Sequence, residues 1–152
     1  MPYKNIEDKR NAAIRYNNSE RGYLVNLFND MFKPSSIKRR NLVPMITKED
    51  LWIEMLLHIE KMKGMFPKSD GRICLYCFNP WSYARYRSNT KNNPTHTKTS
   101  TNLSIDRIDN TKTYLVQNIA FVCQKCNTDK CSMSLQQMKR VRIVAKERGL
   151  IN

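Results

Sequence analysis

The sequence predicts an α+β fold, with helices toward both ends of the chain and two short strands between them. Amphipathic patterns at residues 20–32, about 48–63 and about 134–148 predict helices, because apolar residues recur there at helical spacing. Alternation of apolar and polar residues around 103–105 and an apolar run at 118–123 are typical of strands. We therefore expect a small sheet with helices on either side of it.

Local signals mark where these helices begin and end. Ser19 can cap the first helix, and Thr47 with Asp50 forms a capping box in which Asp replaces the usual Glu. Pro34 is expected to end the first helix and to open a basic connector toward the second. Residues 1–17 are polar and predict either a loose arm or a short helix. A further short helix is expected after Cys123.

Length and composition fit an ordinary soluble domain. The chain has 152 residues, of which 40% are hydrophobic and 26% charged, which suits one domain or one domain with a short appendage. No apolar run is long enough to cross a bilayer, and the first residues lack the apolar core of a signal peptide. Five cysteines, an odd number, disfavour a secreted disulfide scaffold. We therefore expect a cytoplasmic protein in a reducing compartment, with no membrane partner.

Charge gives the first indication of a partner. Lys and Arg number 27 against 13 Asp and Glu, so the formal net charge is +14. Most of this excess lies in three stretches, residues 33–40, 80–100 and 134–152, and the middle one has no acidic residue. Such clustering favours a polyanion, nucleic acid ahead of an anionic membrane, over a merely solvated surface.

The cysteines predict a zinc site. Two CxxC pairs can form the closed four-thiolate shell that Zn²⁺ prefers in structural sites. The predicted zinc ligands are Cys74, Cys77, Cys123 and Cys126. Residues 78–122 separate the pairs, a longer stretch than the ~15–20 residues of a simple zinc ribbon, so the site must contain an insertion. A thioredoxin-like redox pair is the alternative, but it needs one CxxC near a βαβ pattern. Cys131 is expected to be a buried or free thiol rather than a fifth ligand.

The insertion and the helix after it carry polar residues in a recognisable order: Asp106, Arg107, Tyr114, Asn118, Asn127 and Lys130. Together with both cysteine pairs, this order resembles the ββα-metal nucleases of the HNH superfamily over roughly residues 72–135. The resemblance implies a ββα-metal motif inserted in the four-cysteine zinc site and flanked by helices. It also implies metal-dependent hydrolysis of DNA phosphodiester bonds.

One position departs from the usual pattern. Arg107 stands where the family normally has its His general base, and arginine cannot accept a proton at working pH. The chain resembles a branch of HNH enzymes, including rare-cutting restriction endonucleases, that has Asp-Arg followed by a Tyr. Tyr114 stands at that spacing, and in the branch this Tyr lies by the scissile phosphate as a nucleophile or as a group that orients water.

The resemblance assigns a role to each remaining residue. Asp106 and Asn127 offer oxygen ligands, which suit Mg²⁺ or Mn²⁺ better than zinc. Arg107 can stabilise negative charge that develops on the phosphate. Asn118 is expected to tie its loop to the first strand by backbone hydrogen bonds, and Lys130 to contact a phosphate. Asp109 is expected to form a turn rather than to bind metal.

Further DNA contacts are predicted outside this centre. Aromatic residues and arginines alternate after the first cysteine pair, a mixture that suits phosphate contacts and base stacking, although Trp81 can equally pack the zinc knuckle. The predicted DNA-binding residues are Lys38, Arg39, Arg40, Arg85, Arg87, His96 and Lys130. His96 is also a second candidate for the missing base, whereas His58 is expected to be a core or surface residue in the middle of its helix.

The sequence thus predicts three regions: a helical DNA-contacting region at 1–70, a zinc-bound HNH core at 71–135 and a basic helix at 136–152. It predicts an HNH endonuclease that acts on double-stranded DNA at specific sites. A homing, phage or restriction enzyme fits this prediction. A double-strand break needs a homodimer or two sequential cuts. The alternatives are a non-catalytic zinc-ribbon protein that binds nucleic acid and a structure-specific nuclease for branched DNA.

Overall fold

The structure is a computed structural model, and it describes residues 6–17, 19–83, 85–86, 97–98, 100–131 and 133–147. Its helices are α1 (Ile6–Asn17), α2 (Glu20–Met31), α3 (Pro34–Arg40), α4 (Lys48–Met65), α5 (Gln124–Lys130) and α6 (Leu135–Glu147). Its strands are β1 (Arg85–Tyr86), β2 (Thr97–Lys98), β3 (Leu103–Arg107) and β4 (Ile119–Cys123), with a short 3₁₀ turn, η1, at Val116–Asn118. The predicted α+β class is confirmed.

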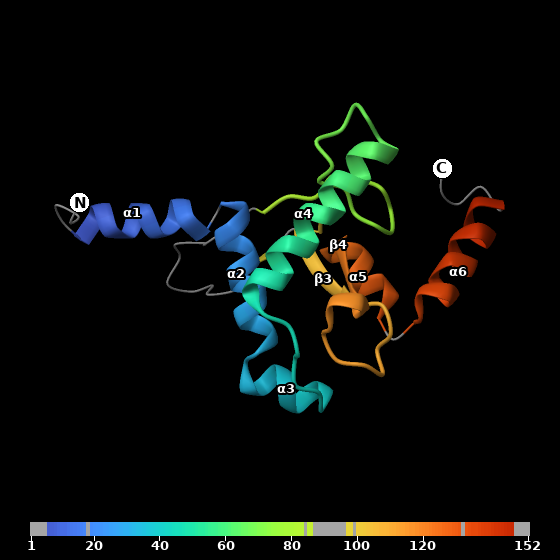
Figure 1. Cartoon of the computed structure of the whole chain (residues 1–152), viewed down its shortest axis with the longest axis horizontal. Coiled ribbons are helices and arrows are strands. Elements are labelled where there is room, and N and C mark those ends of the chain that lie inside the picture. Colours follow the sequence, from blue (N-terminus) through green and yellow to red (C-terminus); the bar gives the residue numbers. More distant parts are fainter. Residues whose placement is uncertain are drawn as a thin grey trace.

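A β-hairpin lies at the centre of the chain, between the helices of its two ends (Figure 1). β3 and β4 pair antiparallel, so that Ile105 faces Phe121 and Asp106 faces Ala120 across the ladder. Because side chains of a strand alternate between the two faces of its sheet, the hairpin has two different sides. Ile105 and Phe121 lie on the side of α2 and α4, and Ala120 lies with the cysteines.

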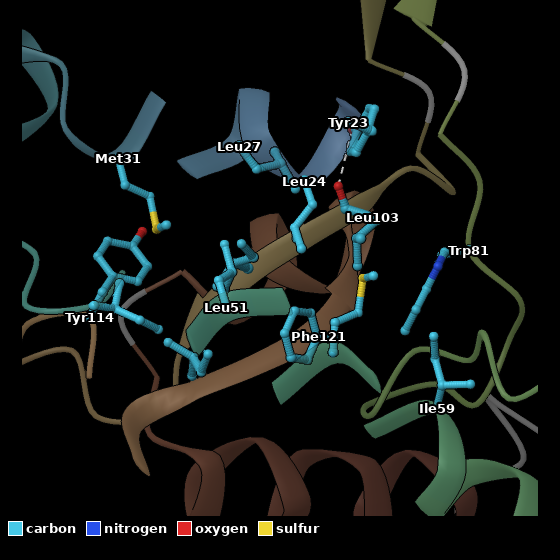
Figure 2. Close-up of a cluster of buried hydrophobic side chains, with 14 residues drawn as sticks. Tyr23, Leu24, Leu27, Met31, Leu51, Ile59, Trp81, Leu103, Tyr114 and Phe121 are labelled. Carbon is cyan, nitrogen blue, oxygen red and sulfur yellow. Dashed lines mark hydrogen bonds between the residues drawn. The ribbon is translucent and has the colours of Figure 1, made fainter. Parts of the chain in front are cut away.

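The main hydrophobic core fills the side of the hairpin that faces α2 and α4 (Figure 2). Leu24, Leu51 and Met55 from the two helices pack there with Leu103 and Phe121 from the hairpin. Tyr23, fully buried on α2, donates a hydrogen bond from its hydroxyl to the carbonyl oxygen of Leu103 at 3.1 Å. The first helices and the hairpin therefore share one core, which fixes their relative position.

The predicted caps of α2 and α4 are confirmed. Ser19 Oγ accepts a hydrogen bond from the Gly22 backbone N–H, and both bonds of the Thr47–Asp50 capping box are present. Gly22 is needed for packing, since a Cβ there would lie 1.8 Å from the carbonyl oxygen of Tyr16. Of the two conformations expected for residues 1–17, the described residues Ile6–Asn17 form the helix, α1.

The prediction of a basic connector without regular structure after Pro34 is wrong, because these residues form a helix. Residues Pro34–Arg40 form the helix α3, with Pro34 in its first turn and Asn41 ending it at a φ of 52°. Proline lacks only an N–H that the first turn of a helix leaves unpaired anyway, so Pro34 both ends α2 and begins α3. α3 carries its three basic residues in its last turn.

The two final helices follow the expected order. Cys123 ends β4 and caps α5, where its Sγ accepts a hydrogen bond from the Cys126 N–H at 3.5 Å. Met138 on α6 is buried with the cysteine side of the hairpin. None of the helices that the structure describes is long and apolar enough to cross a membrane.

Candidate functional site

The four predicted zinc ligands come together in the fold. The Sγ atoms of Cys74, Cys77, Cys123 and Cys126 all lie within 4.8 Å of one another, and those of Cys77 and Cys123 are 3.8 Å apart. A tetrahedron with Zn–S bonds of about 2.3 Å has edges of about 3.8 Å, so the sulfur atoms already have nearly the spacing of a zinc shell. The donor set and the geometry fit Zn²⁺. Cys131 is a free, exposed thiol outside this group.

Backbone turns place the two cysteine pairs. The first pair lies in a turn in which the Phe78 N–H donates to the Cys74 carbonyl oxygen, and Phe78 has a positive φ of 58°. The Leu75 N–H donates to the Phe121 carbonyl oxygen at 3.0 Å, which docks this turn on β4. Hydrogen bonding from Cys126 lowers the pKa of Cys74 to about 5, whereas burial raises the pKa of Cys77 to about 11. One thiol of the cluster therefore loses its proton readily, and a bound metal ion would displace the protons of the others.

A second polar group lies on the same side of the hairpin, around Asp106. Asp106 is only 4% exposed, and its Oδ2 accepts hydrogen bonds from the Tyr76 hydroxyl at 2.6 Å and from Lys130 Nζ at 2.8 Å. Lys130 is fully buried and also donates to the Arg107 carbonyl oxygen at 2.5 Å. Lys130 and Asp106 thus form a buried ion pair at the end of the hairpin.

Tyr76 is a site residue that the sequence interpretation missed. It lies between Cys74 and Cys77, in the turn that is called the zinc turn below. This turn places the Tyr76 hydroxyl against Asp106, 30 positions further along the chain. Burial and the hydrogen bond to Asp106 raise the pKa of Tyr76, so the phenol keeps its proton in this arrangement. In the sequence, Tyr76 is marked only as an ionisable residue between two predicted metal ligands. That position does not indicate which side chain it contacts.

Asn127 lies beside this group on α5. Its Nδ2 donates to Ser104 Oγ at 2.7 Å and approaches the Ile105 carbonyl oxygen at 3.5 Å. Ser104 and Asp106 are two positions apart on β3 and so share one face of the strand. Asn127 and Lys130 are one helical turn apart and both face β3. The structure thus brings Asp106, Asn127, Lys130 and Tyr76 to one place.

Arg107 and Tyr114 lie in a different group, on the side of the main core. Arg107 pairs with Ile119 across the ladder, and its Nη1 donates to the carbonyl oxygens of Asn110 and Lys112 at 3.0 Å each. Its guanidinium carbon is 5.6 Å from the centroid of the Tyr114 ring. Tyr114 is 9% exposed and packs in the core (Figure 2).

Arg40 covers the same tyrosine ring. Its guanidinium carbon lies 5.0 Å from the ring centroid, and its Nη1 donates to the Tyr114 hydroxyl at 3.2 Å. A second bond, from Nη2 to the Met31 carbonyl oxygen at 2.8 Å, anchors it to the end of α2. Burial lowers the pKa of Arg40. Among the contacts of the described residues, Tyr114 therefore meets two arginines and not Asp106.

Asn118 closes the loop between the two strands. Its Oδ1 accepts a hydrogen bond from the Asp109 N–H at 2.8 Å, and its Nδ2 donates to the carbonyl oxygens of Asp109 and Thr113. Asp109 Oδ1 accepts hydrogen bonds from the N–H and the hydroxyl of Thr111, which makes a tight turn. Both side chains hold the loop in place.

The residues predicted to contact DNA differ in their exposure. Lys38 and Arg39 are exposed on α3, whereas Arg40 is turned inward over Tyr114. Lys130 was expected to contact a phosphate, but its fully buried ammonium faces Asp106 and has no path to a phosphate in this conformation. The physical reason is that its helix packs directly on β3.

The remaining candidates lie in or near the long polar loop. Arg85 is described in its backbone only, and Arg87 and His96 lie outside the described residues. Trp81 is buried in the main core, where it stacks on His58 at a centroid distance of 5.2 Å. His58 also bonds the Ile73 carbonyl oxygen through Nε2 at 2.8 Å, so both rings are packing residues.

The fold and the site together define a ββα unit built on a four-cysteine metal cluster. The sequence matches no family model and no curated protein. The structure is similar to a solved chain of the rare-cutting HNH restriction endonuclease PacI. The two chains are 21% identical, the match covers 83% of this chain and 81% of that one, and the TM-score is 0.48. A likeness at this level assigns no activity, so the case for a function comes from the residues of the site.

Proposed function

We propose that this chain is a metal-dependent DNA endonuclease of HNH type, which hydrolyses phosphodiester bonds. The observation that carries the proposal is the buried Asp106 carboxylate, held by Tyr76 and Lys130 beside Asn127. This group lies on a ββα unit whose sulfur cluster fits zinc. A net charge of +14 supports DNA as the partner.

The residues at this site fit a hard divalent cation. Asp106 and Asn127 would hold it, because carboxylate and amide oxygens are the ligands that Mg²⁺ and Mn²⁺ prefer. When bound, such an ion acts as a Lewis acid toward a phosphate and stabilises the leaving 3′ oxygen. The cysteine cluster serves a structural Zn²⁺, since four thiolates leave no open position for a substrate.

The chain's own side chains set up the reaction around this position. The Tyr76 hydroxyl fixes Oδ2 of Asp106 and is the phenol nearest the proposed metal ligands, so it takes the role that the sequence suggested for Tyr114. In that role it keeps its own proton and orients the Asp106 carboxylate that would hold the metal ion. Arg107 lies on the other face of the hairpin, held by two loop carbonyl groups beside Tyr114, so the chemistry proposed at Asp106 does not use its side chain.

The zinc turn gives the site its rigidity. Tyr76 lies between two zinc ligands, Cys74 and Cys77, and α5 begins at a third, Cys123. Asn127 and Lys130 follow on that helix, so one metal cluster positions residues from both ends of the insertion. This arrangement explains why a simple zinc site is opened by a long insertion.

The substrate is proposed to be double-stranded DNA with a defined site, cut by a restriction, homing or phage-type enzyme in a cytoplasm. One centre per chain cuts one strand, so a homodimer or two successive cuts complete a break. The competing function is binding of nucleic acid without catalysis, which the replacement of the usual His by Arg107 favours.

Cleavage of supercoiled plasmid and AT-rich genomic DNA with Mg²⁺ or Mn²⁺ tests the proposal. We expect discrete products that disappear with Asp106→Ala, while salt-sensitive DNA binding remains. Binding without cleavage by the wild-type protein, under every metal tried, would leave the non-catalytic function. Branched substrates beside linear duplexes identify a structure-specific enzyme.

A further inference from the structure

A buried lysine, Lys130, forms an ion pair with Asp106, the proposed metal ligand. Lys130 Nζ has three oxygen atoms around it: Asp106 Oδ2 at 2.8 Å, the Arg107 carbonyl oxygen at 2.5 Å and Asn110 Oδ1 at 3.4 Å. The residue is 0% exposed, and three acceptors match the three N–H bonds of an ammonium. Burial of a charge is costly without such pairing, so the position is built to hold a cation.

Asp106 and Lys130 already balance each other's charge without a metal ion. The pair lies 2.8 Å apart, and Tyr76 and Asn127 beside it are neutral. A divalent cation that approaches Asp106 therefore meets a carboxylate whose charge the Lys130 ammonium already offsets.

The contacts also distinguish the two carboxylate oxygens. Tyr76 and Lys130 both bond Oδ2, and none of the described residues donates a hydrogen bond to Oδ1. A cation can therefore bind at Oδ1 while the ammonium stays on Oδ2. Two cations on one carboxylate lie within about 5 Å of each other and repel strongly in a poorly hydrated site.

We propose that Lys130 is a built-in counter-ion that keeps the Asp106 site poorly loaded with divalent metal until a DNA phosphate arrives. The phosphate supplies the negative charge that the site lacks, so metal loading and substrate binding are coupled. This inference rests on the proposed function only in taking Asp106 as the metal ligand. It explains why a basic residue that binds no DNA directly occupies the centre of the site.

Binding of Mn²⁺ to the zinc-loaded protein, followed by electron paramagnetic resonance at pH 8.5, tests the inference. Without DNA, Lys130→Met is expected to bind Mn²⁺ at least about tenfold more tightly than the wild type, because a repelling charge is gone. Lys125→Met is the matched control on the same helix: Lys125 is exposed and pairs with Asp129, so its loss is expected to leave Mn²⁺ binding unchanged.

A short duplex oligonucleotide provides the second arm. After subtraction of the Mn²⁺ bound by the duplex alone, DNA is expected to tighten Mn²⁺ binding of the wild type more than that of Lys130→Met. Circular dichroism and zinc content check that each variant is folded. Lys130→Gln keeps two donors without the charge, and it replaces Lys130→Met if that variant does not fold.

The Asp106→Asn variant distinguishes a failure of the proposed metal ligand from a failure of the proposed role of Lys130. If Asp106→Asn leaves Mn²⁺ binding unchanged, Asp106 is not a metal ligand. This result would contradict the proposed metal-dependent nuclease. If Asp106→Asn abolishes Mn²⁺ binding but the folded Lys130 variant binds no more tightly than the wild type, the role of Lys130 is overturned and the nuclease proposal stands.

Discussion

The two faces of the β3–β4 hairpin use neighbouring residues for different purposes. Asp106 faces α5 and the cysteine cluster, where it meets Tyr76 and Lys130. Arg107, one position later, stacks on Tyr114 on the side of the main core. Residues adjacent in a strand point to opposite faces, so one motif divides into a polar centre and a packing group. The comparison teaches that order along the chain does not decide which side chains share a site.

The largest expected effect comes from the sulfur cluster, on the first of these faces. Cys126→Ser removes one of four ligands, and we expect a loss of at least about 3 kcal/mol in the free energy of unfolding, because structural zinc sites contribute folding energy directly. Thermal unfolding followed by circular dichroism measures it. Cys131→Ser, at an exposed thiol outside the cluster, is the control; equal stability of the two variants would contradict a structural zinc site.

A core substitution on the opposite face is expected to cost stability without touching the chemistry. Leu51 is fully buried, and Leu51→Ala is expected to lower the free energy of unfolding by about 2–5 kcal/mol. At a temperature where the variant is still folded, its cleavage rate is expected to match that of the wild type. A folded variant that has lost cleavage would show that the two faces are not separate.

The arginine that covers Tyr114 is expected to have a smaller effect of the same kind. Arg40→Met removes the stacking on the ring and the bonds to Tyr114 and Met31, at a cost of about 1–2 kcal/mol. Denaturant unfolding measures the loss, and Arg39→Met, at an exposed neighbour on α3, controls for charge. The account is contradicted if Arg40→Met leaves stability at the level of that control.

A pH dependence on the core side is expected to be the smallest effect. Burial lowers the pKa of His58 below its ordinary value of about 6.5, so the folded state binds a proton less readily than the unfolded state. The corresponding stability is present above about pH 6.5 and is lost as the pH falls through the folded pKa. His58→Gln can keep the bond to Ile73 and is expected to flatten this decline in urea titrations at pH 7.5 and 5.5. An equally steep decline in the variant assigns it to other groups.

Local features of the fold could be predicted from the sequence, because their signals lie within a few residues. Ser19 and the Thr47–Asp50 box mark helix starts by hydrogen bonds that they make to their own first turns. The four cysteines were identified as a cluster because ligand spacing within each pair is also local. α3 was missed, since Pro34 permits both the end of one helix and the first turn of the next.

The partners within the site could not be predicted in the same way. The bond between Tyr76 and Asp106 depends on how the zinc turn docks on β4, which spacing along the chain does not specify. Lys130 was expected to contact a phosphate, and only the packing of α5 on β3 shows that it is buried against Asp106. Tyr114 was assigned by its distance from Asp106 in sequence, a quantity that says nothing about the face of the hairpin.

The most direct test of this account compares two single hydroxyl deletions, Tyr76→Phe and Tyr114→Phe, in the same plasmid cleavage assay. Tyr76→Phe is expected to reduce the cleavage rate about 100-fold with DNA binding retained, the size typical of losing the group that positions a reacting site, because the phenol fixes the Asp106 carboxylate. Tyr114→Phe is expected to cleave within about threefold of the wild type and to lose only the stability of its bond to Arg40. The reverse pattern, with Tyr114 essential and Tyr76 dispensable, would place the chemistry on the other face of the hairpin and contradict the account.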